Sequence, residues 1–142
     1  MKYKVEEDKV LVSLEKGDEI FNSLYNLIDE INIKFGWING IGAVENITLG
    51  SYSANLKDYI KKEFKDEFEL TSLIGNITTK NERPFIHIHV NVSDQECNAY
   101  GGHLFSGTIT ATCEIIILLS KEPLNRKKSS DIGLYLWDVN EE

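Results

Sequence analysis

The chain has 142 residues, a formal net charge of −8 and ordinary apolar and charged fractions, so we expect one soluble domain over residues 1–142. The acidic balance argues against a nucleic-acid surface, because affinity for phosphates depends largely on lysine and arginine. We find no secretory signal or membrane-spanning stretch, and Cys97 and Cys113 make no disulfide framework, so we expect a cytoplasmic protein without membrane partners.

The predicted elements begin with a strand and a helix. Residues 9–15 alternate as a strand does, and residues 18–35 place an apolar stripe on one helical face. Asp18 and Glu19 suit the start of this helix, Lys34 suits its end, and Gly36 suits the residue after it. The glycine-rich segment 36–44 lacks the full spacing of a nucleotide-binding loop, so close packing of a strand or turn explains it better.

Further strands follow in quick succession, separated mostly by short turns, which indicates antiparallel pairing. Their expected ranges are about 45–53, 58–64, 68–78, 84–92, 103–119 and 133–138. The basic run Arg126-Lys127-Lys128 is expected to be a solvated loop. The predicted fold class is therefore α+β, a single domain with a mainly antiparallel sheet and one principal helix packed on it.

All three histidines fall within one short part of the chain. His87 and His89 would lie on the same face of the strand 84–92, about 7 Å apart along it, opposite a row of β-branched residues. Two imidazoles at that spacing can turn toward one cation, and His103 is the obvious third ligand. The alternative is a set of surface or interface histidines that make ordinary hydrogen bonds.

The position of His103 conflicts with the pattern around it. On a regular strand it is in phase with Phe105 and Ile109, which should be buried. We expect a bulge or a positive φ at Gly101-Gly102 to turn His103 toward the other two histidines. If the glycines are regular and His103 lies in the core, the next candidate ligands are Cys97, Asp94 and Glu114.

The strand 103–119 also carries a row of hydroxyl side chains that ends at Glu114. If this strand pairs with 84–92 as a hairpin, the hydroxyl row shares a sheet face with His87 and His89. Such a face would be a wet cleft, a surface covered by another subunit, or an ordinary solvent-exposed face.

Several short motifs occur in a characteristic order along nearly the whole chain. They are Gly40-Ile41-Gly42-Ala43, the segments 69–77 and 83–89, Gly101-Gly102-His103-Leu104, Gly107, Leu124, Arg126, Asp131 and Gly133-Leu134. This set resembles the PPC domain, the plants-and-prokaryotes conserved domain found beside AT-hooks in plant nuclear proteins. The resemblance implies a homotrimer in which His87, His89 and His103 hold a divalent metal ion, with zinc as the first candidate. In plant members of this family, DNA is bound by a separate AT-hook segment, which this chain lacks.

Three classes of function follow. The first is a homotrimeric metal-binding domain that recognises a small molecule or a protein partner. The second is a zinc-dependent enzyme with a metal-bound water, for which Glu114 or Asp94 could serve as the base, although no catalytic residue is assigned. The third is a DNA-associated regulatory protein, although the acidic balance predicts no specific nucleic-acid binding by this chain alone.

Overall fold

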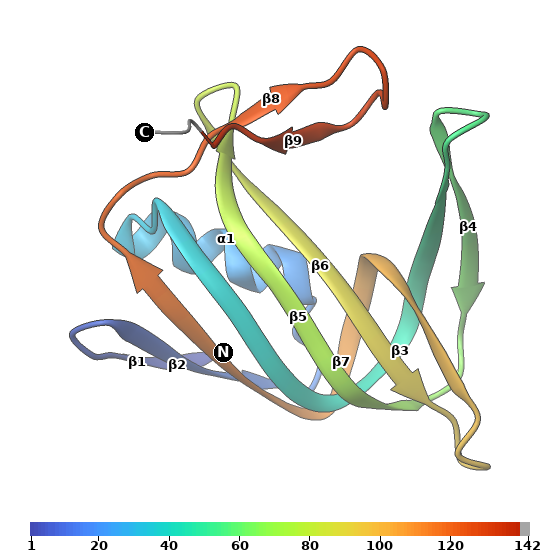
Figure 1. Cartoon of the computed structure of the whole chain (residues 1–142). Coiled ribbons are helices and arrows are strands. Elements are labelled where there is room, and N and C mark those ends of the chain that lie inside the picture. The colour runs from blue at the N-terminus through green and yellow to red at the C-terminus, as the bar shows by residue number, and fades with distance from the viewer. Residues whose placement is uncertain (140–142) are drawn as a thin grey trace.

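The computed structural model describes residues 1–139 and contains, within them, nine strands and one helix (Figure 1). The elements in chain order are β1 (Lys2–Val5), β2 (Lys9–Glu15), α1 (Ile20–Ile31), β3 (Phe35–Ser53), β4 (Asp58–Phe64), β5 (Phe68–Lys80), β6 (Arg83–Ser93), β7 (Ala99–Ser120), β8 (Arg126–Lys128) and β9 (Tyr135–Trp137). Seven strands form one antiparallel sheet in the order β1-β2-β7-β6-β5-β3-β4, and β8 pairs with β9. The predicted α+β class, mainly antiparallel with one principal helix, is confirmed.

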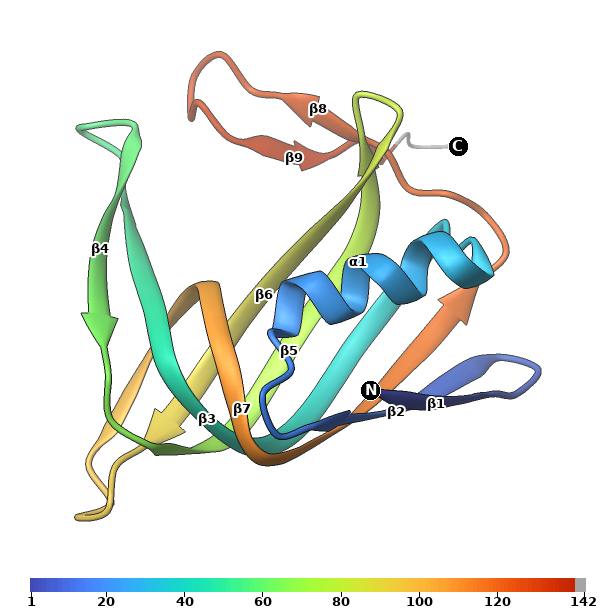
Figure 2. The same cartoon turned by 180° about the vertical axis from the view of Figure 1, so that it is seen from behind.

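The two longest strands, β3 and β7, bend strongly and shape the molecule (Figure 1). Each pairs with different neighbours along its length, and the pairings β3–β5, β5–β6, β6–β7 and β7–β3 form a closed circuit. Helix α1 covers one face of the sheet, as the reverse view shows (Figure 2). The opposite face, seen in Figure 1, carries the histidines.

Helix α1 packs its apolar stripe into the core but is shorter than predicted. It is capped at its start by the Glu19 side chain, which accepts a hydrogen bond from the Asn22 amide. Its C-cap is Asn32, whose left-handed backbone (φ 57°) turns the chain so that the Ile33 amide donates to the Ile28 carbonyl. The expected end at Phe35, with Gly36 after it, was therefore wrong, because asparagine also tolerates the left-handed conformation.

The glycine-rich segment 36–44 forms the first part of β3, so the close packing expected there is confirmed. A side chain at Gly42 would place its Cβ 2.4 Å from the Thr112 carbonyl oxygen of the neighbouring strand. Two short strands, β1 and β8, were not predicted. The run Arg126-Lys127-Lys128, expected to be a loop, is β8 and pairs with Tyr135–Trp137.

Among residues 1–139, no helix combines the length and the apolar character needed to cross a membrane.

Candidate metal centre

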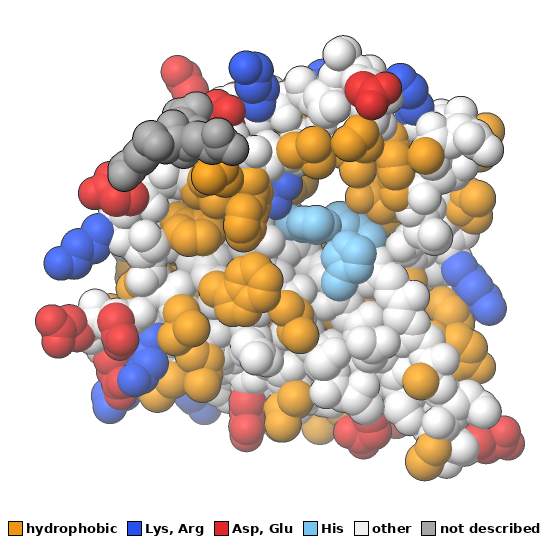
Figure 3. Space-filling model, viewed as in Figure 1, with side chains coloured by type: hydrophobic (Ala, Val, Ile, Leu, Met, Phe, Trp, Pro, Cys, Tyr) orange, Lys and Arg blue, Asp and Glu red, His pale blue; other side chains and the backbone are white. Residues whose placement is uncertain are grey.

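The three histidines converge on the sheet face opposite the helix. The ring centroids of His87 and His89 lie 5.1 Å apart, those of His87 and His103 lie 5.1 Å apart, and those of His89 and His103 lie 5.5 Å apart. One nitrogen from each ring lies within 4.8 Å of a nitrogen from the other two. In the space-filling view the three side chains gather in a hollow of this face (Figure 3).

The strand register explains why the rings meet. Along β6, His87 and His89 alternate with the buried residues Ile86, Ile88 and Val90, as the sequence pattern predicted. Across the β6–β7 pairing, His89 lies directly opposite His103. Residues opposite each other in an antiparallel pair project to the same face, so all three imidazoles share one side of the sheet.

His103 leaves the apolar phase, but not at the glycines. Neither Gly101 nor Gly102 has a positive φ, and both pair in regular register with β6. The phase changes after His103: Leu104 pairs with Leu49 and Ser106 with Thr48, which leaves an extra residue on β7 at this point. The bulge expected at the glycines therefore lies at Phe105, which shares the side of His103, while Ile109 is in the core.

The two glycines instead permit close approach of neighbouring strands. A Cβ on Gly102 would lie 2.9 Å from the carbonyl oxygen of Gly50, the β3 residue that pairs with His103. Backbone atoms cannot move aside cheaply, so a side chain at Gly102 would push β7 away from β3 beside the third histidine.

Two of the rings are held as neutral bases. Burial, followed by the charges of Arg126 and His89, lowers the pKa of His87 from 6.5 to about 4. Burial, followed by the neighbouring histidines and Lys61, lowers the pKa of His103 from 6.5 to about 4 as well. A neutral imidazole has a free lone pair, which is the form that binds metal ions.

His103 shows the further sign of a ligand whose partner is not a protein group. Its Nδ1 atom is buried and has no hydrogen-bond partner among the described residues. A buried polar atom without a partner costs about 1–3 kcal/mol. The ring itself packs against both Tyr59 and Phe105, with centroid distances of 4.8 Å and 4.7 Å.

The donor set suits a divalent ion. Three imidazole nitrogens make up the protein ligands of one well-known kind of zinc site, and zinc–nitrogen bonds are about 2.0–2.1 Å long. Nitrogens around a tetrahedral zinc are therefore roughly 3.3 Å apart, and small rotations of the rings would bring the present ones to that separation. When bound, such an ion would supply a Lewis acid with a coordination position open to a ligand.

The other candidate ligands and bases lie elsewhere. Asp94 accepts hydrogen bonds from the amides of Glu96 and Asn98 within the loop after β6, and Cys97 is exposed in the same loop. Glu114 pairs with Ser13 of β2 and Ile41 of β3. The only cluster of metal-ligating side chains found among the described residues contains the three histidines alone.

The hydroxyl row does not reach the histidines, although Glu114 at its end lies beside Ile41 on the same sheet face. The β6–β7 pairing covers only the stretch from His89–His103 to Ser93–Ala99. Farther along, β7 pairs with β3 and β2, and the Thr112 hydroxyl donates to the Leu14 carbonyl of β2. None of the hydroxyl row lines the hollow at the histidines.

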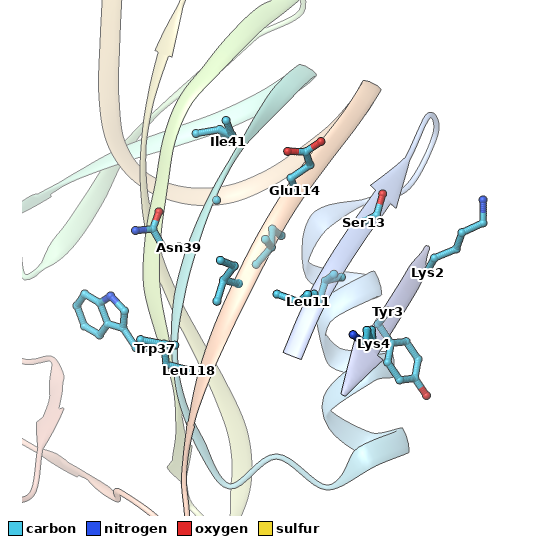
Figure 4. A pocket seen from close by; sticks show the side chains of 14 residues that line it. Lys2, Tyr3, Lys4, Leu11, Ser13, Trp37, Asn39, Ile41, Glu114 and Leu118 are labelled. Atoms are coloured by element: carbon cyan, nitrogen blue, oxygen red, sulfur yellow. The ribbon is translucent and has the colours of Figure 1, made fainter. Parts of the chain in front are cut away.

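A large exposed apolar surface lies on the same sheet face, which we name the apolar face. Its members are between 40% and 56% exposed: Trp37, Ile41, Ile74, Ile116 and Leu118. Figure 4 shows Trp37 beside Leu118, with Ile41 and Glu114 farther along the same two strands. Ile74 pairs with His89 across β5 and β6, so the apolar face reaches the histidines. The sequence analysis did not identify this surface: Trp37 and Ile41 lie in the segment 36–44, which was explained by close packing, and the other three residues were given no role.

The fold and the histidine cluster define a class, a small α+β domain with a candidate three-histidine metal site on the open face of its sheet. The sequence profile of the Plants and Prokaryotes Conserved (PCC) domain matches residues 1–120. The chain therefore belongs to this family, as its motifs indicated.

Solved structures agree with this assignment. A candidate DNA-binding protein from Bacteroides thetaiotaomicron is 33% identical, with a TM-score of 0.93 and 96% of each chain covered. A metal-containing protein from Archaeoglobus fulgidus is 34% identical, with a TM-score of 0.85 and 96% of each chain covered. A plant- and prokaryote-conserved protein from Pyrococcus horikoshii is 30% identical, with a TM-score of 0.87 and 99% and 97% covered. The comparison with curated proteins finds no match.

Proposed function

We propose that this chain is a metal-binding domain that holds one divalent ion, zinc in the first place, through His87, His89 and His103. The observation that carries the proposal is the convergence of three imidazoles, one of them with a buried nitrogen that has no protein partner. The metal-containing relative from Archaeoglobus fulgidus supports it. The ion would leave a coordination position for a small molecule or a group from a partner protein.

We further propose that the domain assembles as a homotrimer through the apolar face. A monomer rarely leaves so large a contiguous apolar surface in water, and this one runs along β3 and β7 from the cross-strand pair of Trp37 and Leu118 to Ile41. The number three rests on the family resemblance. Because Ile74 lies opposite His89, the interface would border the metal site.

The proposed domain is the whole of 1–142, although the family profile ends at residue 120. Arg126 supports the longer boundary, because it donates to side chains of Asn76 and Thr78 on β5. The last three residues of the predicted domain, 140–142, lie outside the part of the chain that the structure describes. A cytoplasmic location also remains our proposal, supported by the two free cysteines.

A chelator-competition titration with zinc tests the metal proposal. Wild-type protein should bind one zinc per chain, and His89→Ala should weaken binding at least tenfold, because it removes one of three ligands. Asp94→Ala and Cys97→Ser are matched controls that remove the alternative ligands and should bind as the wild type does. Wild-type affinity in His89→Ala, or its loss in either control, would overturn the site.

Light scattering tests the assembly. A trimer of the 16.2 kDa chain has a mass of about 49 kDa. Leu118→Asp on the apolar face should lower the mass toward that of one chain, whereas Ile60→Asp on β4, a still more exposed apolar residue outside that face, should not. A monomer mass for the wild type at micromolar concentration would refute the proposal.

A further inference from the structure

The hollow at the histidines continues into a cavity beside two of them. It has a volume of about 500 Å³, which is in the usual range for small-molecule sites. Its walls are largely aromatic and aliphatic, and His87 and His103 form part of them. The basic residues of its lining are Lys80, Arg126 and Lys128, and its aromatic rings include Phe85, Phe105 and Tyr135. We name this cavity the β8–β9 pocket, because the hairpin supplies many of its walls.

The charge of the β8–β9 pocket is opposite to that of the chain. The whole sequence has 23 acidic and 15 basic side chains, yet the described lining holds three basic side chains and no aspartate or glutamate. In Figure 3 the acidic side chains lie around the margin of this face and away from the histidine hollow. A metal ion on three neutral imidazoles would add two further positive charges.

Arg126 is the central cation of the pocket, and neutral groups hold it in place. Its guanidinium donates to the side-chain oxygens of Thr78 and Asn76 and to the carbonyl of Tyr135, each at 2.8 Å. No carboxylate pairs with it within the described chain. A guanidinium has five N–H donors, so these three bonds leave two donors available.

The lack of a counter-ion is costly for a half-buried charge. Burial lowers the pKa of Arg126, because the low-dielectric surroundings disfavour its charged form. A protein that needed only structural hydrogen bonds at this place could use a neutral side chain. A cation fixed in a pocket without an acid partner is instead suited to an anion that arrives with a ligand.

Aromatic rings complete the environment. The Arg126 guanidinium lies 5.0 Å from the Phe85 ring centre, and Lys80 Nζ lies 4.0 Å from that of Tyr135. Phe105 also lines the pocket and packs on Tyr59 at 5.1 Å. The rings fix the cations in place and leave apolar walls for the uncharged part of a ligand.

The hairpin that covers the pocket is tied to the rest of the domain. The Tyr52 hydroxyl at the end of β3 donates to the Ile132 carbonyl, and Lys57 Nζ donates to the Ser130 carbonyl at 3.2 Å. Arg126 fixes the other end of the hairpin to β5. The pocket is therefore formed before any ligand enters, which lowers the entropic cost of binding.

We propose that the β8–β9 pocket binds a small organic anion, a carboxylate with an apolar or aromatic portion. The carboxylate is directed to Arg126 and to the metal on the histidines, and the apolar portion packs between Phe85 and Phe105. This inference rests on the proposed metal site for one of its two charged ends. It names the chemical class of ligand that the site takes and explains the reversal of charge in an acidic protein.

Calorimetric titration of the zinc-loaded protein with benzoate tests the proposal. Benzamide has the same ring without the charge, and acetate has the charge without the ring. Benzoate should bind saturably in the millimolar range or tighter, and both comparison compounds should bind at least tenfold more weakly. Equal binding of benzamide would overturn the role of the cations, and equal binding of acetate would overturn that of the apolar walls.

Variants separate the pocket from general charge effects. Arg126→Gln should weaken benzoate at least tenfold, and Lys80→Gln several-fold, whereas Arg83→Gln, the other arginine of the chain, should have no effect. Because Arg126 also tethers β8, Lys80→Gln provides the test in a variant whose β8 tether is intact. Unchanged benzoate affinity in Lys80→Gln and Arg126→Gln would refute the pocket.

Zinc content is measured on the same samples, and this distinguishes the two proposals. Absence of zinc from the wild type after incubation would overturn the proposed metal site. One zinc per chain without benzoate binding would overturn the anion site alone. With cobalt(II) in place of zinc, benzoate should change the visible absorption spectrum, because a carboxylate entering the coordination sphere alters its geometry.

Discussion

The metal-free protein should lose stability in mildly acidic solution because of His87 and His103. In the folded chain the pKa of each is lowered from 6.5 to about 4, chiefly by burial. Between these values the unfolded chain takes up protons that the folded chain does not, and stability then rises with pH. The stability contributed by the two neutral rings is therefore complete above about pH 6.5 and is lost as the pH falls toward 4.

The structure sets the size of this effect. One pKa unit corresponds to about 1.4 kcal/mol, so a fully buried ring with this shift would contribute roughly 3 kcal/mol. Both rings are only half-buried, and solvent screening reduces the contribution to about 1 kcal/mol each. About half of the combined ~2 kcal/mol should be lost by pH 5, a measurable part of a typical stability of about 5–15 kcal/mol.

Urea unfolding in the presence of a chelator, at pH 7 and pH 5, measures this loss. The comparison is with the double variant His87→Phe/His103→Phe, which keeps the acidic residues and removes both imidazoles. Wild type should lose about 1 kcal/mol more than the double variant over this range. An equal loss in the two proteins would refute the reasoning, because the pH dependence would then come from other groups.

Further predictions follow from single features of the fold. Gly102→Val should cost about 1–3 kcal/mol of stability and weaken zinc binding, because the new side chain would meet the Gly50 carbonyl. Ala54→Val in the exposed β3–β4 turn should do neither, and equal zinc affinities of the two variants would contradict this. Native protein should react with a thiol reagent only at Cys97, because burial raises the pKa of Cys113 to about 12. Mass spectrometry that finds the label on Cys113 of the native protein would contradict this. Duplex DNA at about 150 mM salt should not bind with submicromolar affinity, and a steeply salt-dependent complex would show that the acidic balance was misread.

Local pattern was sufficient to predict β6 and the placement of its histidines. The buried row of Ile86, Ile88 and Val90 alternates strictly, and a strand has only two faces, so His87 and His89 could lie only on the other one. Strand β4 was also predicted with its observed bounds, although it has no buried row.

Long-range pairing could not be predicted in this way. The bulge at Phe105 results from the register that β7 adopts with β3, a strand more than 50 residues earlier in the chain. The role of Arg126 depends in the same way on the contact of β8 with β5, which no local pattern indicates. The sequence of Arg126-Lys127-Lys128 predicts a solvated loop, because it does not reveal that Asn76 and Thr78 are the partners of Arg126.

The most direct test of the central claim is anomalous diffraction at the zinc absorption edge from crystals of protein incubated with zinc. We predict one anomalous peak per chain, bounded by the imidazoles of His87, His89 and His103. The absence of a peak there, or a peak coordinated instead by residues such as Asp94 and Cys97, would contradict the proposed metal centre.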